Sequence, residues 1–203
     1  MQTRRGFLAV TAGIAVAGCG EGSGGAGTTT DTAAGGTATD ESGTPEGGGS
    51  LAFSTPAFGD GGTIPERHTG VGADVSPELS IESVPEAAET LALVVDDPDA
   101  NDYVHWLLWN VPADTETVPE GIEQTETVPE LDDARQGTNN FGELGYRGPL
   151  PPQGDGPHTY RFTMSAVDTT PDLEAGAGRG ELASALDGHV VDTDRIAGEF
   201  ERE

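Results

Sequence analysis

Acidic, imidazole and phenol side chains recur between residues 97 and 160 at spacings that suit a small polar pocket. They are the carboxylates of Asp97 and Asp99, the imidazoles of His105 and His158, and the phenol of Tyr160. A stiff segment, Gly145-Tyr146-Arg147-Gly148-Pro149-Leu150-Pro151-Pro152, lies between the two histidines. Polar groups at strand ends beside a rigid loop can bind a small ligand on a fixed scaffold.

Each of these residues also has a plain structural interpretation. Asp97 and Asp99 flank a proline at a strand end, where carboxylates often cap backbone amides in a turn. His105 lies within an apolar stretch and is explained equally well as a hydrogen-bonded core histidine. His158 follows a Gly/Pro loop, where a side chain often faces a cleft, and the prolines at 149, 151 and 152 stiffen the wall beside it.

Strands dominate the periodicity. Residues 160–166 alternate between apolar and polar side chains, which predicts a strand with one buried face. Residues 91–95 and 104–111 are apolar runs of strand length, the second interrupted only by His105 and Asn110. Weaker strand patterns cover residues 79–84 and 51–53.

One helix is predicted, over residues 179–186, with Leu182 and Leu186 four residues apart and Gly188 placed to end it. Several strands with one late helix indicate a mainly β fold, a β-sandwich. Residues 112–140 are acidic and irregular and repeat Glu-Thr-Val-Pro-Glu at 116–120 and 126–130, which we interpret as a duplication in a surface loop.

Other polar residues are assigned no site role from the sequence. His68 lies in a polar stretch and is expected to be exposed, and His189 lies between the helix and the last strand. Asp74 and Ser76-Pro77 predict only a turn before residue 79.

The N-terminal residues predict export and anchoring. Arg4-Arg5 precede an uncharged run from Gly6 to Gly18, which is shorter than the roughly 20 residues that span a bilayer. Residues 1–18 therefore resemble a twin-arginine signal with a lipobox before Cys19, the predicted lipidation site. Residues 19–50, rich in Gly, Thr, Ser and acids, predict a disordered tether, and residues 51–203 a single folded domain. The predicted location is the outer face of the cytoplasmic membrane.

The charge balance excludes one class of partner. The chain has 36 acidic residues against 9 basic ones and a formal net charge of -27. Nucleic-acid binding needs a basic surface, so it is excluded as a function. Acidic residues spread over a whole domain are typical of a protein adapted to high salt, which screens their repulsion.

Several motifs together resemble the phosphatidylethanolamine-binding protein family, in its bacterial and archaeal Raf-kinase-inhibitor-like branch. They cover nearly the whole domain, in the expected order: Asp74-Val75-Ser76-Pro77-Glu78-Leu79-Ser80, Asp97-Pro98-Asp99-Ala100, His105 with Asn110, Gly145 to Gly154, His158-Thr159-Tyr160 and Leu186-Asp187-Gly188-His189-Val190. The resemblance implies a β-sandwich dominated by a large antiparallel sheet, with a short C-terminal helix.

The resemblance also implies a ligand cavity that accepts small anions and phosphorylated headgroups. Its residues, carried over to this chain, are Asp97, Asp99, His105, Gly148, Pro149, His158 and Tyr160. The chain departs from the family pattern at Asn101, where a second proline is common, and at Arg147 and Leu150. Arg147 could favour an anion or could pair with a nearby acid. Prokaryotic members can form dimers, so a homodimer is a further expectation.

The leading functional hypothesis is an exported, lipid-anchored binding module without catalytic activity and without a cofactor or metal. His105, His158 and Tyr160 would donate hydrogen bonds to an anion, while Asp97 and Asp99 orient the imidazoles and raise their pKa. This predicts tighter anion binding as the pH falls through about 6.5. Two alternatives are open: a protease-inhibiting or other interaction module, and a metal-dependent hydrolase that uses the histidines and aspartates as ligands.

Overall fold

The computed structural model describes residues 49–203. The predicted export signal, the lipidation site Cys19 and nearly all of the predicted tether lie outside the described residues. Within residues 49–203 no helix has the length and apolar character needed to cross a bilayer.

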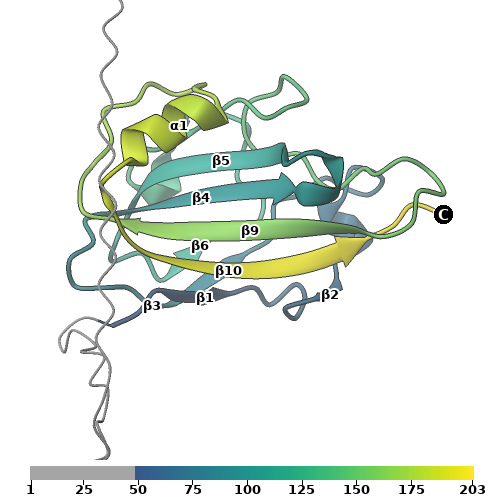
Figure 1. Cartoon of the computed structure of the whole chain (residues 1–203), viewed down its shortest axis with the longest axis horizontal. Coiled ribbons are helices and arrows are strands. Elements are labelled where there is room, and N and C mark those ends of the chain that lie inside the picture. The colour runs from purple at the N-terminus through teal and green to yellow at the C-terminus, as the bar shows by residue number, and fades with distance from the viewer. Residues whose placement is uncertain (1–48) are drawn as a thin grey trace, which may run out of the picture. The chain divides into compact units, whose positions relative to one another are not determined.

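A seven-stranded sheet forms the centre of the domain, in the order β2-β10-β9-β4-β5-β8-β7 (Figure 1). The long strands are β4 (Thr90–Asp97), β5 (Tyr103–Pro112), β9 (His158–Val167) and β10 (Val190–Phe200), and the short ones are β2 (Gly62–Thr63), β7 (Thr127–Val128) and β8 (Ala134–Gln136). Neighbours are antiparallel except β2, which runs parallel to β10. The predicted large antiparallel sheet is confirmed, with one parallel pair at its edge.

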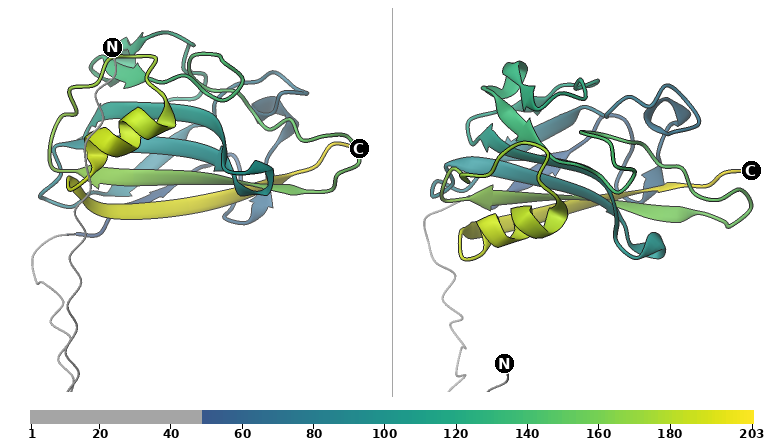
Figure 2. Two further views of the ribbon diagram at one scale, coloured as in Figure 1. Left: turned by 45° about the horizontal axis from the view of Figure 1, so that its top comes forward. Right: turned by 90° about the horizontal axis from the view of Figure 1, so that it is seen from above.

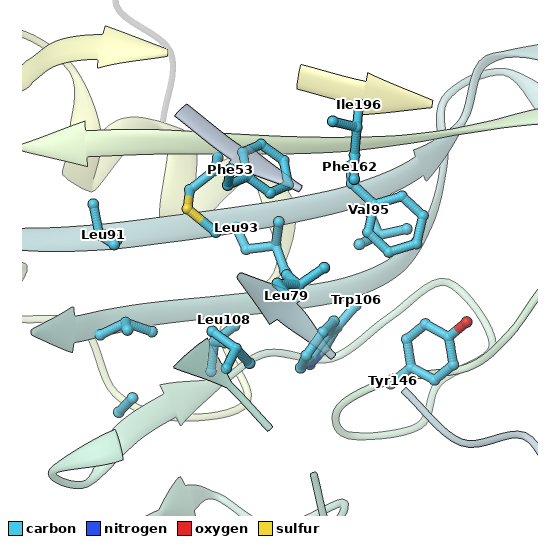
Figure 3. Packing of buried hydrophobic residues seen from close by; sticks show 14 of the residues in the cluster. Phe53, Leu79, Leu91, Leu93, Val95, Trp106, Leu108, Tyr146, Phe162 and Ile196 are labelled. Atoms are coloured by element: carbon cyan, nitrogen blue, oxygen red, sulfur yellow. The ribbon is translucent and has the colours of Figure 1, made fainter. Parts of the chain in front are cut away.

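A smaller antiparallel sheet, β1-β3-β6, packs on one face of the large sheet and completes the sandwich. Its strands are β1 (Ala52–Ser54), β3 (Leu79–Ser83) and β6 (Thr117–Val118). Phe53 and Leu79 from this sheet meet Leu93, Trp106 and Phe162 from the large one, and all five are buried (Figure 3). Removing this apolar surface from water is the main source of stability for the fold.

Helix α1 (Arg179–Leu186) covers part of the opposite face of the large sheet, away from β1 and β3 (Figure 2). Its Leu182 and Leu186 pack with Ala92, Leu107 and Trp109 in a second core cluster. β4 and β5 are therefore buried on both faces, which explains why their sequences are apolar without alternation. The helix has the predicted bounds, and Gly188 follows it with a φ of 80°.

The prediction of one surface loop over residues 112–140 is wrong. The segment contains β6, β7, the 3-10 turn η3 (Pro129–Leu131) and β8. The two Glu-Thr-Val-Pro-Glu copies place Val118 and Val128 in strands of different sheets, and both valines are 1% exposed. Strands of two residues are too short for alternation to reveal them, so the sequence pattern could not predict these anchors.

Candidate functional site

A cavity of about 240 Å³ opens where β4 ends and β5 and β9 begin. We call it the histidine pocket. Four of the seven predicted site residues line it, and they are Asp97, His105, His158 and Tyr160. The remaining lining residues are Ala100, Tyr103, Phe141, Leu150, Pro151 and Pro152.

Asp97 and His158 form a buried pair. Asp97 is the last residue of β4 and His158 the first of β9, and Nδ1 of His158 donates to Oδ2 of Asp97 over 2.7 Å. The other oxygen of Asp97 accepts from the backbone amides of Asp99 and Ala100. The carboxylate therefore caps the turn η2 (Pro98–Ala100) and orients the imidazole at the same time.

The pKa of His158 reflects two opposing effects. Burial by itself lowers this pKa, but the hydrogen bond and the charge of Asp97 outweigh burial, with help from Asp155 and Asp99, and raise it above its ordinary value. On its other nitrogen, Nε2, the ring meets Oδ2 of Asp155 over 3.4 Å. Asp155 is 61% exposed at its side chain, so this second contact is at the solvent boundary.

His105 occupies a β-bulge. Val95 pairs with Trp106 and Asp96 pairs with Val104, so the ladder between β4 and β5 skips His105. The extra residue lets Trp106 face the main core while Val104 faces the α1 side, and it directs the imidazole into the histidine pocket. Bulges of this kind re-aim side chains at functional sites.

The expectation that Asp97 and Asp99 orient both imidazoles and raise their pKa is wrong for His105. Its Nδ1 donates to the backbone carbonyl of Arg147 over 2.7 Å. Burial lowers the pKa of His105, and the Arg147 carbonyl and the charge of Asp97 offset this only in part. The ring is neutral near pH 7 with Nε2 unprotonated, so Nε2 accepts a hydrogen bond rather than donating one to an anion.

Three aromatic rings surround His105. The ring centroids of Tyr160, Phe141 and Tyr103 lie 5.1, 5.3 and 5.8 Å from that of the imidazole, all in edge-on arrangements. Such packing holds the imidazole in one orientation and excludes water from it.

The hydroxyl of Tyr160 is buried and makes no hydrogen bond within residues 49–203. Burial raises the pKa of Tyr160, and the carboxylates of Asp97 and Asp99 raise it further. The Asp97 carboxylate is near enough to favour the protonated hydroxyl, but the two groups form no hydrogen bond of acceptable geometry, so the hydroxyl stays protonated and can donate. A buried polar group without a partner costs about 1–3 kcal/mol. This hydroxyl belongs to a residue that lines the histidine pocket.

Three predicted site residues are not part of the lining. Asp99 accepts from the backbone amide of Thr159 over 2.8 Å and ties η2 to β9. Gly148 donates its amide to Asp74, and the carbonyl of Pro149 accepts from Gly70. These residues position the walls of the pocket, and their contact with a ligand stays a prediction.

Gly148 is required by close packing. A Cβ at this position would lie 2.4 Å from the carbonyl oxygen of His68, 2.7 Å from the Cα of Thr69 and 2.9 Å from a carboxylate oxygen of Asp74. Backbone atoms cannot give way at such distances, so only glycine fits.

The sequence assigns Asp74 to a turn and nothing more, yet the structure makes it a support for the pocket. With a φ of 58°, it directs Oδ1 to the amide of Gly148 and Oδ2 to Nη1 of Arg147, over 2.7 and 2.8 Å. The guanidinium of Arg147 therefore pairs with an acid, which decides between the two roles open to it. Arg147 presents its carbonyl, not its charge, to His105.

Two further expectations are resolved by geometry. Asn101 adopts a left-handed conformation with a φ of 58°, which proline cannot take, so this turn differs from one with proline at that position. The prediction that His68 is exposed is wrong: the residue is 4% exposed, and its Nδ1 bonds to the carbonyl of Val75 over 2.8 Å. His189, assigned to no site, lies at the surface beside Asp168.

The sequence did not identify Ala100, Tyr103 and Phe141 as lining residues. Tyr103 stands two residues before His105, which is a usable signal for an aromatic neighbour on the same strand. Phe141 lies in a loop after β8, and no local pattern marks it.

No group of three or more His, Cys, Asp or Glu side chains in residues 49–203 is arranged to hold a metal ion. The predicted metal-hydrolase alternative therefore has no ligand set in the part of the chain that the structure describes.

The sequence and the fold were compared with those of known proteins. The family model for phosphatidylethanolamine-binding protein matches residues 54–201. The UPF0098 protein PH1269 of Pyrococcus horikoshii is 43% identical over 147 residues, covering 71% of this chain and 74% of that protein. A UPF0098 protein of Methanothermobacter thermautotrophicus is 43% identical over 150 residues, covering 73% of this chain and 97% of its own.

Two solved structures share the fold. The crystal structure of CT736 from Chlamydia trachomatis, described as a putative phosphatidylethanolamine-binding protein homolog, has a TM-score of 0.68 and 32% identity, covering 76% of this chain and 99% of its own. YbcL of E. coli, described as a new member of the mammalian PEBP family, has a TM-score of 0.70 and 26% identity, with coverage of 76% and 100%. The motifs, the sandwich and these matches agree: the chain belongs to the phosphatidylethanolamine-binding protein family.

Proposed function

We propose that the chain is an exported, lipid-anchored binding module whose histidine pocket holds a small anionic or phosphorylated group. The observation that carries the proposal is the hydroxyl of Tyr160, which is buried, protonated and without a hydrogen-bond partner within residues 49–203. Buried donors in folded proteins are almost always paired, so a ligand oxygen is the natural partner for this one.

Only the His158 side of the pocket favours the positive charge that an anion needs, because the neutral form of His105 is favoured on the other side. Asp97 lies behind His158 and balances its charge once the imidazole is protonated. A ligand oxygen placed between Tyr160 and Nε2 of His158 would receive two donors and would displace the long contact to Asp155. Nε2 of His105 would accept from a hydroxyl or an ammonium group of the same ligand.

The walls and the size of the pocket limit the ligand. Leu150, Pro151 and Phe141 are apolar, and hydrogen bonds are stronger in such surroundings than in water. A volume of about 240 Å³ is below the usual range for drug-sized molecules, which indicates a headgroup or a free anion rather than a whole lipid.

Calorimetric titration of the full chain with inorganic phosphate and phosphoethanolamine tests the binding proposal. Tyr160→Phe removes the unpaired donor, so we expect affinity to fall at least tenfold with the stability of the fold nearly unchanged, because no protein hydrogen bond is lost.

Thr90→Val is the matched control. Thr90 begins β4, at the opposite end of the strand from Asp97, and its buried hydroxyl donates to the carbonyl of Thr169 over 2.7 Å. This variant should lose about 1–3 kcal/mol of stability and retain binding. If phosphate and phosphoethanolamine each bound Tyr160→Phe as tightly as they bind the wild-type chain, the proposed ligand contact would be refuted.

Export and anchoring rest on Arg4-Arg5 and the small residues before Cys19. Cys19→Ser in the full chain removes the only thiol that could carry lipid. We expect the protein to move from the membrane fraction to the soluble fraction of the producing cells. Continued membrane association of the serine variant would contradict the anchor.

A further inference from the structure

The charged residues buried in β4 point to two different hollows. Asp96 and Asp97 are the only buried acidic residues within residues 49–203. Because side chains alternate along a strand, Asp97 faces the histidine pocket and Asp96 faces the α1 side of the sheet. The second hollow, of about 220 Å³, lies between α1 and the outer face of β4, β9 and β10.

This second hollow gathers arginines in a chain that has few of them. Arg161, Arg179 and Arg195 all line it, although the full sequence has only 9 basic residues against 36 acidic ones. We call this second hollow the arginine hollow; the three arginines and Thr163 form its polar part. Val94, Leu182 and Leu186 form its apolar part and reduce the access of water to the charges.

Two of the arginines are explained by the fold. Arg161 makes a two-pronged contact with Asp96, with both distances 2.8 Å, and Arg179 reaches the same carboxylate over 2.9 Å. Asp102 takes the remaining contact of Arg161 over 2.6 Å. A carboxylate that is 3% exposed needs such partners, so these contacts have a structural role.

Arg195 is not explained in this way. It makes no ion pair within residues 49–203, and its Nε donates to the hydroxyl of Thr163 over 3.1 Å. In the β9–β10 register, Arg195 pairs with Thr163 and Ala197 pairs with Arg161. Arg195 and Arg161 are therefore diagonal neighbours on one face, where like charges repel.

The hydrogen-bond donors of the arginine hollow that have no partner within residues 49–203 match a small oxyanion. Asp96 and Asp102 supply two negative charges against three guanidinium groups, which leaves a net positive charge in a strongly acidic protein. Neither terminal nitrogen of Arg195 has a partner in the described part of the chain, and guanidinium groups bind oxyanions with paired hydrogen bonds. We propose that the arginine hollow is a second binding site, for a small oxyanion of the sulfate or phosphate class.

This inference does not rest on the function proposed for the histidine pocket. Titration of sodium sulfate into the full chain at constant ionic strength tests it, with the Nε–H signals of the arginines followed by NMR. We expect the signals of Arg195 and Arg179 to shift together on sulfate addition. Arg195→Gln, a change at an exposed residue, should weaken sulfate binding at the hollow at least tenfold.

Arg67→Gln is the matched control, because it removes the same charge from an exposed pair with Glu120. Arg67→Gln should leave sulfate affinity within twofold of the wild-type value. Tyr160→Phe should likewise leave the affinity for the sulfate bound at the arginine hollow within twofold. Three results would each overturn the inference: no shift of the Arg195 signal, an equal loss in Arg67→Gln and Arg195→Gln, or loss of all sulfate binding in Tyr160→Phe. Phosphoethanolamine binding to Arg195→Gln reports on the histidine pocket separately.

Discussion

The pKa values of the two histidines are shifted in opposite directions, although both residues line the same pocket. His158 donates to a carboxylate, so its charged form is favoured, whereas His105 donates to a carbonyl and is buried among aromatic rings, so its neutral form is favoured. One ring can carry a positive charge, and the other can accept a hydrogen bond on its Nε2. This division of roles belongs to the individual residues and their hydrogen-bond partners.

An NMR titration of the imidazole Cε1–H signals checks this division. We expect the pKa of His158 above 6.5 and that of His105 below it, and we expect Asp97→Asn to lower the pKa of His158. Because the pKa of His158 is raised on folding, its protonation stabilises the fold fully below about pH 6.5. That contribution is lost as the pH rises through the folded pKa. A pKa for His158 unchanged by Asp97→Asn would show that Asp97 does not control it.

At the scale of elements, the pocket depends on a segment that contributes no lining residue to it. Residues 68–74 support the loop before β9: the carbonyl of His68 accepts from Tyr146, and Asp74 holds Gly148. The same loop presents the Arg147 carbonyl to His105. Loop and support therefore form one unit, which explains why Asp74 and Gly148 belong to the motifs without lining the cavity.

Gly148→Ala tests this unit. The added Cβ would overlap backbone atoms of His68 and Thr69, so we expect a loss of about 1–3 kcal/mol in the free energy of unfolding, measured by urea denaturation.

Gly180→Ala serves as its control. Gly180 lies in α1 with open space around a new Cβ, and alanine there should stabilise the fold by about 0.5–1 kcal/mol. If both alanines had the same effect, close packing at Gly148 would not be the reason for its presence.

For the molecule as a whole, the excess of negative charge destabilises the fold, and salt reduces this destabilisation by screening the charges. Apart from Asp96 and Asp97, every acidic residue in residues 49–203 is at least partly exposed, and few arginines offset them. Repulsion among surface charges destabilises the compact state, and its range falls from about 10 Å at 0.1 M salt to about 3 Å at 1 M. Adaptation to high salt is therefore a proposal about the whole surface rather than any one site.

Thermal unfolding in 0.1 M and 2 M KCl measures this effect. We expect Tm to rise by several degrees or more in the higher salt, because a gain of about 1 kcal/mol in stability raises Tm by about 2–4 °C for a domain of this size. A charge-reduced variant, with Glu86, Glu126 and Glu130 changed to Gln and Asp114 to Asn, should show a smaller rise. These four residues are exposed. An equal rise in both proteins would attribute the effect to salt on hydrophobic burial instead.

Much of the fold follows from local pattern. The alternation in residues 160–166 and the apolar runs at 91–95 and 104–111 correspond to β9, β4 and β5, and the helix at Arg179–Leu186 matches its prediction. Long elements repeat their period several times, so the signal is strong. The strands of two or three residues in 112–140 contain no full period, and the sequence missed them.

The sequence by itself determined the long strands, the helix, the acidic surface and the motifs that indicate the family, because each is encoded in neighbouring residues or in composition. Only the tertiary structure decided which atoms meet: the bulge at His105, the carbonyl that fixes its proton, the unpaired hydroxyl of Tyr160, and the gathering of Arg161, Arg179 and Arg195 beside Asp96. Asp97 and His158 are separated by 61 residues, and Asp74 and Gly148 by 74. Contacts over such separations depend on strand register and loop packing, which no local stretch of sequence specifies.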